Sequence, residues 1–257
     1  MSENKYGSTL AEVFANAARR FDGIPAFCRK DKSGSFVPLG FRDLYEKGLD
    51  LATALIGLGV EARDHVGLIA DNRLEWIVCD YGILLAGAAD VPRGTDITDA
   101  EMVYILTHSD ARVVFVENTT ILRRLLEHRA QLPNLREVIL MAPGESAPEG
   151  VRHLETLIAD GAARRAAGVD VALQRARAIQ PGDLFTIIYT SGTTGTPKGV
   201  QLTHANMCSQ IENLPLELRP GDRALSILPI WHSYERVFEM FCVSRGVTTH
   251  YTSLRAL

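Results

Sequence analysis

Apolar residues recur at the spacing of an amphipathic helix in two stretches near the start of the chain. Between Ser8 and Phe21 the apolar positions fall three and four residues apart, and a similar stripe runs from Phe41 to Leu58. Because such positions share one face of a helix, each stretch predicts a helix with one buried side. Ser8 is a residue type favoured at helix N-caps, so we expect it to begin the first helix.

Further along, short runs rich in apolar and β-branched residues alternate with helical stretches. This alternation predicts an α/β fold in which helices cover a sheet. The predicted strands are His65–Ala70, Arg112–Glu117 and Glu137–Met141, and the predicted helices are Arg73–Ala86, Thr98–His108 and Thr120–Gln131.

The chain changes character near residue 180. Ala142–Gly150 contains Pro and Gly and predicts a loop, a helical passage follows from His153 to Arg177, and residues 180–183 predict a turn leading into a strand. We therefore expect a first α/β subdomain over residues 1–180 and the start of a second over residues 181–257.

Most of the first 180 residues have the composition of a scaffold. Asp71-Asn72-Arg73 follows a predicted strand and either lines a crevice or caps the next helix. For the segment from Val91 to Thr95 we expect only packing and a turn.

The composition is that of a soluble protein with enough apolar residues for a sizeable core. The 257 residues are 46% hydrophobic and 23% charged, with a net charge of -4. This charge, and the lack of a long Lys/Arg cluster, argue against a nucleic-acid partner. No apolar run reaches about 18 residues, and charged residues stand where a signal peptide would be apolar, so we expect a cytoplasmic protein. The four cysteines are widely spaced, which predicts buried thiols rather than a zinc site or disulfides.

Residues 189–200 read Tyr-Thr-Ser-Gly-Thr-Thr-Gly-Thr-Pro-Lys-Gly-Val and follow an apolar run. The glycines allow backbone N–H groups to approach an anion closely, the hydroxyls can donate hydrogen bonds, and Lys198 can place a positive charge on phosphate oxygens. The segment therefore predicts a phosphate-binding loop.

Commoner nucleotide motifs do not fit this loop. A Walker A loop counted from Gly192 has Pro197 at its second glycine and Gly199 at its hydroxyl position. The dinucleotide fingerprint also fails, because its first two glycines are two residues apart and it opens a helix, whereas Lys198-Gly199-Val200 predicts a return into a strand. A surface turn without function is the remaining alternative.

A second candidate segment surrounds His232. The apolar run Ala224–Leu228 predicts a strand and Pro229 ends it, so Trp231 and His232 fall at a carboxyl end of the sheet. In open α/β sheets that end faces the ligand crevice. His232 taken alone would equally predict a helix cap or a core residue, and Trp231 a core aromatic.

The loop from Tyr189 to Val200 resembles the signature loop of the adenylate-forming superfamily, which contains acyl-CoA synthetases, luciferases and the adenylation domains of peptide synthetases. Residues 228–232 lie where that superfamily has its Leu-Pro-x-x-His motif. The pair Glu235-Arg236 is similar to the version in long-chain fatty acyl-CoA synthetases, although alone it would also predict a charge pair on the first turn of an exposed helix. The resemblance implies the amino-terminal part of the large domain of an adenylate-forming enzyme, with helix-covered sheets.

The resemblance also implies a reaction in two halves. A fatty-acid carboxylate attacks the α-phosphate of Mg-ATP to give an acyl-adenylate and pyrophosphate, and coenzyme A then releases AMP. By the same resemblance, the catalytic residues are Lys198 and His232, the nucleotide-binding residues are Thr190, Ser191, Gly192, Thr193, Thr194, Gly195 and Lys198, and the Mg²⁺ contact is Thr194.

Several motifs of the superfamily are not found up to Leu257. They are the acid that holds magnesium, the aspartate that binds ribose, the hinge, and the C-terminal domain with its lysine. We therefore expect a truncated, amino-terminal part of such an enzyme that binds nucleotide weakly and does not turn over alone. A non-catalytic regulatory or nucleotide-binding fragment, and a ligase for an aryl or medium-chain acid, stay open as alternatives. The sequence leaves open the acyl chain length, the oligomeric state and a peripheral contact with membranes.

Overall fold

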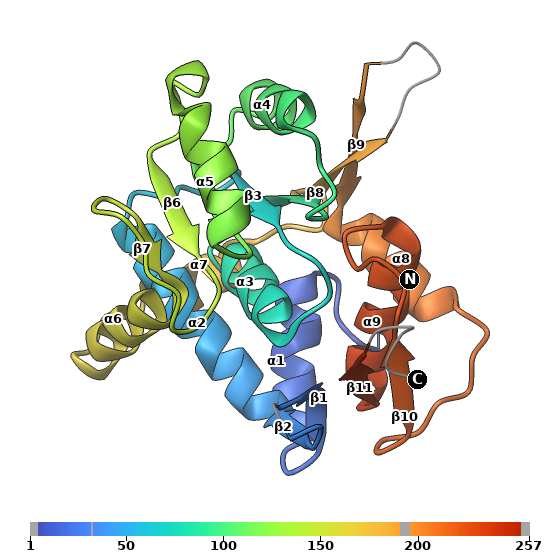
Figure 1. Ribbon diagram of the computed structural model, residues 1–257. Coiled ribbons are helices and arrows are strands. Elements are labelled where there is room, and N and C mark those ends of the chain that lie inside the picture. Colours follow the sequence, from blue (N-terminus) through green and yellow to red (C-terminus); the bar gives the residue numbers. More distant parts are fainter. Residues whose placement is uncertain (1–4, 32, 191–195, 253–257) are drawn as a thin grey trace.

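The computed structural model describes residues 5–31, 33–190 and 196–252. Within this part of the chain the strands form two sheets, one of seven strands in the order β7-β6-β5-β3-β4-β8-β9 and one of four in the order β10-β11-β1-β2 (Figure 1). The strands of the larger sheet are β3 (His65–Ile69), β4 (Ala89–Arg93), β5 (Val113–Val116), β6 (Glu137–Leu140), β7 (Arg152–His153), β8 (Leu184–Thr190) and β9 (Lys198–Thr203). Those of the smaller sheet are β1 (Pro25–Lys30), β2 (Phe36–Gly40), β10 (Arg223–Ser226) and β11 (Thr248–Tyr251).

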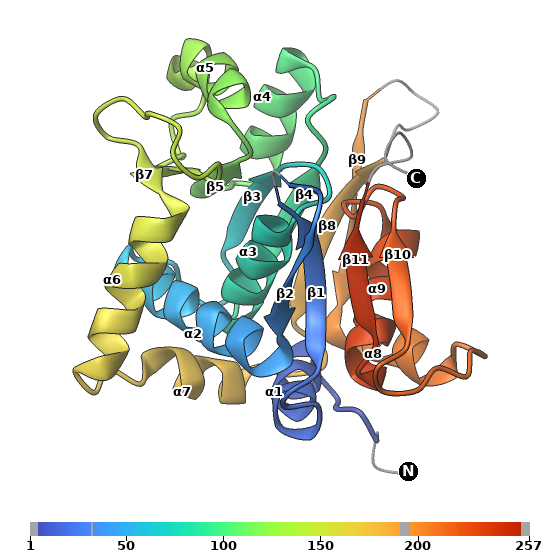
Figure 2. The ribbon, with the colours of Figure 1, turned by 60° about the horizontal axis from the view of Figure 1, so that its bottom comes forward.

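Helices cover both faces of the larger sheet (Figure 2). Along β5, Val113 and Phe115 enter the core that holds α2 and α3, whereas Val114 and Val116 enter the core that holds α4 and α5. This is the alternation of side chains that a strand buried on both faces requires. The helices are α1 (Leu10–Arg20), α2 (Phe41–Gly57), α3 (Leu74–Leu85), α4 (Asp99–His108), α5 (Thr119–Glu127), α6 (Leu154–Ala166), α7 (Val171–Ala178), α8 (His204–Asn213) and α9 (Ser233–Arg245), with a short 3-10 turn at Arg129–Gln131.

The order of the strands creates a switch point between β3 and β4. The chain passes from β3 through α3 to β4, which lies beside β3, and then returns through α4 to β5 on the other side of β3. Both neighbours of β3 run parallel to it. Ligands of open α/β sheets bind outside the carboxyl ends of strands at such a point, so the residues that follow β3 and β4 are the first place to look for a site.

The α/β fold predicted from the sequence is confirmed, and its strands and helices lie close to the predicted ranges. Two local predictions are wrong. Thr9, not Ser8, caps α1, because its side chain accepts the amide N–H of Glu12. The segment from Val91 forms part of strand β4 instead of only a turn. The predicted helical passage from His153 to Arg177 consists of two helices, α6 and α7, with Gly168, at φ 90°, between them.

Both sheets contain strands from both sides of residue 180. Strand β8 pairs with β4, and β11 pairs with β1. The division into subdomains over residues 1–180 and 181–257 stays a prediction. The four cysteines are free and buried, as expected. No helix within the described ranges is both long and apolar enough to cross a membrane.

Candidate functional site

The predicted phosphate loop lies on a hairpin that projects from the edge of the larger sheet (Figure 1). Strands β8 and β9 are antiparallel, and Thr190 pairs with Lys198 at the end of the hairpin next to the connecting segment. The predicted return into a strand after the loop is therefore confirmed. Thr190 and Lys198 are both exposed, so the lysine is available to an anion. The candidate ligands from Ser191 to Gly195, Thr194 among them, lie outside the described residues.

Asn72 joins the end of β3 to the segment that precedes His232. Its Nδ2 donates to Ser226 Oγ at 3.0 Å and to the carbonyl of Leu228 at 2.6 Å, and its Oδ1 accepts the amide N–H of Ile230 at 2.9 Å. Both N–H groups and the oxygen of the Asn72 side-chain amide therefore have hydrogen-bond partners in this segment. Arg73, not Asn72, is the N-cap of α3 and makes no side-chain capping bond, whereas Asn72 lines a hollow of about 440 Å³, in keeping with the crevice interpretation.

The end of β4 contacts the same segment from the other side. Arg93 stacks over the indole of Trp231, with 5.1 Å between the guanidinium carbon and the ring centroid. A Cβ on Gly94 would overlap the indole nitrogen, so the close approach of Trp231 requires glycine here. The side chain of Asp71 accepts the amide N–H and the hydroxyl of Thr95, which ties the ends of β3 and β4 together.

His232 is the N-cap residue of α9, yet its side chain makes no capping bond and is exposed. Its carbonyl accepts the amide N–H of Arg236, and its own amide donates to the carbonyl of Pro229. The imidazole therefore projects from a backbone that is fixed on both sides. No hydrogen bond or ion pair joins His232 to Lys198 among the residues that the structure describes, so the two candidate catalytic side chains do not contact each other directly.

Arg236 lies in the core instead of on an exposed helix face, and Glu235 is also buried. The guanidinium donates to both carboxylate oxygens of Asp90, at 2.9 and 2.7 Å, and to Thr186 Oγ1 at 3.0 Å. It also donates to Asp80. The interpretation of an exposed charge pair is thus wrong. One buried guanidinium joins the start of α9 to α3, β4 and β8.

Burial raises the pKa of the carboxyl groups around this arginine. It raises the pKa of Asp80 to about 7, although the charge of Arg236 opposes the change, and it raises the pKa of Asp90 as well. Burial also raises the pKa of Glu239 to about 8, even though Ser226 and Tyr251 both donate to its carboxylate. The same Ser226 hydroxyl accepts from Asn72, so hydrogen bonds run from the crevice to Glu239 in the core.

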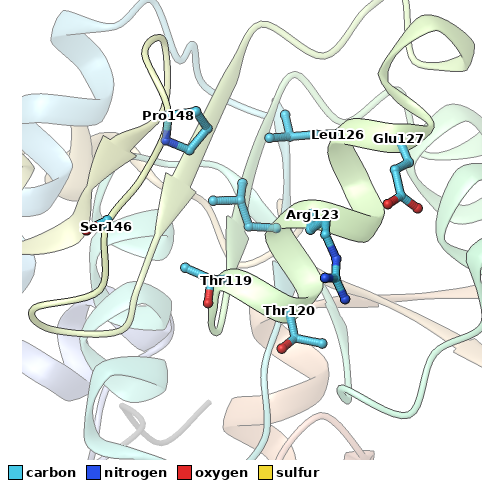
Figure 3. Close-up of a pocket in the computed structure, with 8 residues that line it drawn as sticks. Thr119, Thr120, Arg123, Leu126, Glu127, Ser146 and Pro148 are labelled. Carbon is cyan, nitrogen blue, oxygen red and sulfur yellow. The ribbon is translucent and has the colours of Figure 1, made fainter.

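A separate hollow of about 590 Å³ lies against α5. Figure 3 shows Thr119 and Thr120 at the start of the helix, Arg123 and Glu127 along it, and Pro148 on the facing loop. Its residues belong to neither candidate segment, and Asn118 already caps the helix start by accepting two amide N–H groups.

Known proteins resemble this chain over most of its length. Residues 14–256 match the family model described as AMP-binding enzyme. The chain is 37% identical over 230 residues to the chloroplastic long-chain-fatty-acid acyl-carrier-protein ligase AEE15 of Arabidopsis thaliana, covering 85% of this chain and 32% of the relative. It is 35% identical over 206 residues to the long-chain-fatty-acid CoA ligase FadD15 of Mycobacterium tuberculosis, covering 79% and 33%.

The fold is also shared with solved structures. The anthranilate CoA ligase AuaEII, in complex with anthranoyl-AMP, superposes with a TM-score of 0.79 at 24% identity, over 94% of this chain and 44% of that one. At this identity the likeness concerns the fold. The chain spans about a third of the length of the curated relatives named above.

Proposed function

The chain belongs to the AMP-binding enzyme family, and from this membership we propose that it acts in the ATP-dependent activation of a long-chain fatty acid. The observation that carries the proposal is the exposed lysine of the β8–β9 hairpin, in the sheet whose strand β4 ends at Arg93, which stacks on Trp231 of the second candidate segment. In the proposed first half-reaction, the acid's carboxylate attacks the α-phosphate of ATP, forming an acyl-adenylate and releasing pyrophosphate.

Lys198 supplies the electrostatic part of this step. Negative charge gathers on the pyrophosphate as the bond to the α-phosphate breaks, and a fixed cation lowers the free energy of that transition state. We assign Lys198 to the β- and γ-phosphates, together with Thr190 and the residues Ser191, Gly192, Thr193, Thr194 and Gly195, which lie outside the described part of the chain.

His232 is assigned to the wall of the acyl pocket. Its exposed imidazole starts α9, and the preceding residues are fixed by Asn72 and by the contact between Arg93 and Trp231. The fixed backbone sets where the imidazole starts, and the indole of Trp231 lies beside it, with 6.4 Å between the ring centroids.

The described residues do not fit a Mg²⁺ site by themselves. No group of three or more His, Cys, Asp or Glu side chains in that part of the chain could hold a metal ion. The contact of Mg²⁺ with Thr194 stays a prediction.

The proteins that resemble this chain differ in both the acid and the thiol acceptor. FadD15 is named a CoA ligase, whereas AEE15 is named an acyl-carrier-protein ligase, so a carrier-protein thiol is a second candidate acceptor beside coenzyme A. The acid of AuaEII is anthranilate, which keeps an aryl acid as the alternative substrate. A cytoplasmic location and a peripheral membrane contact stay predictions, since some relatives are named chloroplastic or peroxisomal.

The test measures binding of Mg-ATP and of pyrophosphate to the chain by calorimetry, with Lys198→Ala beside the parent. A hydrogen bond to a charged group contributes about 1.5–3 kcal/mol, so we expect Lys198→Ala to bind roughly tenfold to a hundredfold more weakly. Lys47→Ala, on the exposed face of α2, is the matched control and should bind like the parent. Equal binding by the parent and Lys198→Ala would contradict the proposal.

Exchange of labelled pyrophosphate into ATP then separates the candidate functions. Exchange that depends on palmitate supports activation of a long-chain acid. Exchange that depends on anthranilate instead moves the proposal to an aryl acid. Binding without exchange fits the nucleotide-binding alternative and equally fits the weak binding without turnover that the sequence leads us to expect.

A further inference from the structure

Three aromatic side chains gather where α4 meets the β8–β9 hairpin. Tyr104 and His108 are four residues apart on α4, so they share one face of the helix, and their ring centroids are 5.3 Å apart. Tyr189, near the end of β8, stands perpendicular to both, with centroids 6.3 Å from Tyr104 and 5.7 Å from His108. We call these residues the α4 clamp.

The α4 clamp holds both arms of the hairpin. His108 Nδ1 lies 2.7 Å from the hydroxyl oxygen of Tyr189 on the first arm. Burial raises the pKa of Tyr189 to about 12, so this group keeps its proton at neutral pH. The hydroxyl of Tyr104 donates to the carbonyl of Pro197 at 3.1 Å on the second arm. That carbonyl belongs to the peptide bond that joins Pro197 to Lys198.

The arms are also packed closely against each other. Tyr189 pairs with Gly199 across the hairpin. A Cβ on Gly199 would lie 2.9 Å from Ile187 Cγ2 and 3.2 Å from Tyr189 Cζ, so the glycine makes room for the tyrosine ring. The backbone on either side of Lys198 is therefore constrained, by Tyr104 before it and by Tyr189 after it.

Helix α4 is itself well anchored. Thr98 and Glu101 form a reciprocal capping box at its start. The carboxylate of Glu101 lies 3.7 Å from the guanidinium of Arg93, the residue that ends β4. In addition, Arg124 of α5 donates to the carboxylate of Asp99 at 2.7 Å. These contacts fix α4 against the carboxyl edge of the sheet, and Tyr104 on α4 in turn fixes the arm that bears Lys198.

We propose that Tyr104 is a positioning residue for Lys198, and that its bond to the Pro197 carbonyl holds the lysine where it meets the β- and γ-phosphates. This inference rests on the proposed function. The expected gain is pre-organisation, because an arm fixed before binding does not have to be ordered when the nucleotide arrives.

Tyr104→Phe tests the proposal, because it removes the hydroxyl and keeps the ring that packs on His108. Tyr45→Phe removes a partly buried hydroxyl on α2 and serves as the matched control. Hydrogen exchange of residues 196–200, the affinity for Mg-ATP and the global unfolding midpoint are measured on all three proteins.

A neutral hydrogen bond contributes about 0.5–1.5 kcal/mol. We therefore expect Tyr104→Phe to bind Mg-ATP roughly threefold to tenfold more weakly and to exchange faster at residues 196–200, whereas Tyr45→Phe should match the parent in both. A merely structural role would lower the midpoint without this local change.

Two failures are distinguishable. If Tyr104→Phe and the parent exchange equally at residues 196–200, the clamp is overturned, whatever the parent binds. If the parent does not bind Mg-ATP, the proposed function is overturned, and so is the role of Tyr104 in positioning Lys198 for a nucleotide. Faster exchange in Tyr104→Phe would still establish that the clamp holds the hairpin.

Discussion

Glu239 offers a sharp test of the buried network behind the crevice. Its carboxyl group is fully buried on α9, where Ser226 Oγ lies 2.6 Å from Oε1 and Tyr251 OH lies 3.0 Å from Oε2. Burial raises its pKa from the ordinary value of 4.5 to about 8, so the neutral acid predominates near pH 7. Glu239→Gln mimics that neutral acid, because an amide also offers one donor and one acceptor group.

The sign of the effect follows from proton linkage. A carboxyl whose folded pKa is raised binds more protons in the folded state, so its contribution to stability is fully present below the unfolded pKa and is lost as pH rises through the folded pKa. For Glu239 the window runs from 4.5 to about 8. At about 1.4 kcal/mol per pKa unit, the full loss is roughly 4–5 kcal/mol.

Urea unfolding followed by tryptophan fluorescence measures this between pH 5 and pH 9. Trp76 is buried beside Arg236, with 5.3 Å between the guanidinium carbon and the ring, and reports loss of the core. The variant should be close to the parent in stability near pH 5, and should become relatively more stable as pH rises, reaching a plateau above pH 8. Glu212→Gln, exposed on α8, controls for the loss of one carboxylate. A difference between Glu239→Gln and the parent that does not change with pH, or that shrinks as pH rises, would refute the reasoning.

Two further predictions concern groups that fix the second candidate segment. Arg236→Met leaves Asp80 and Asp90 buried without their cation and should lower the free energy of unfolding by about 3–5 kcal/mol at pH 8. The loss should be smaller at pH 5, where the two carboxyl groups bind protons. Urea titrations at both pH values measure the loss, and a loss that does not depend on pH would contradict the prediction. Asn72→Ala should raise hydrogen exchange at Ile230 above that of the parent; equal exchange in variant and parent would show that the 2.9 Å bond does not protect the amide.

The fold could be predicted largely from periodicity, because most elements carry a strong local pattern. The stripe between Phe41 and Leu58 became α2, and the run from His65 became β3. Strand β4 was missed because its pattern is weak: Pro92 cannot donate to a ladder, and Asp90 is a charged residue in a strand core. Asp90 is tolerated there only because Arg236, 146 positions away in the chain, donates to it. No local pattern reveals such a partner.

The candidate site shows the same limit at the level of single residues. The hydroxyl- and glycine-rich loop and the Leu-Pro-x-x-His segment can be recognised in the sequence because the residues that define each of them lie next to or near one another in the chain. Asn72 and Tyr104 have no such context, since each acts on backbone groups between 93 and 158 positions away. The signal that did exist for Asn72 was its place directly after a buried strand, which left the crevice interpretation open beside the helix cap.

The end of β4 is where the two candidate segments become one arrangement. Arg93 stacks on Trp231 of the segment that leads to His232, and its guanidinium also lies near Glu101 in the capping box of α4, the helix whose Tyr104 holds the arm bearing Lys198. Lys198 begins β9 of the larger sheet and His232 is the N-cap residue of α9, yet the contacts of Arg93 link the surroundings of both to this strand end. Two side chains that never touch can hold a fixed relation when their supports share a rigid element. The geometry of such a site is therefore set by the edge of the sheet more than by the segments that carry the chemistry.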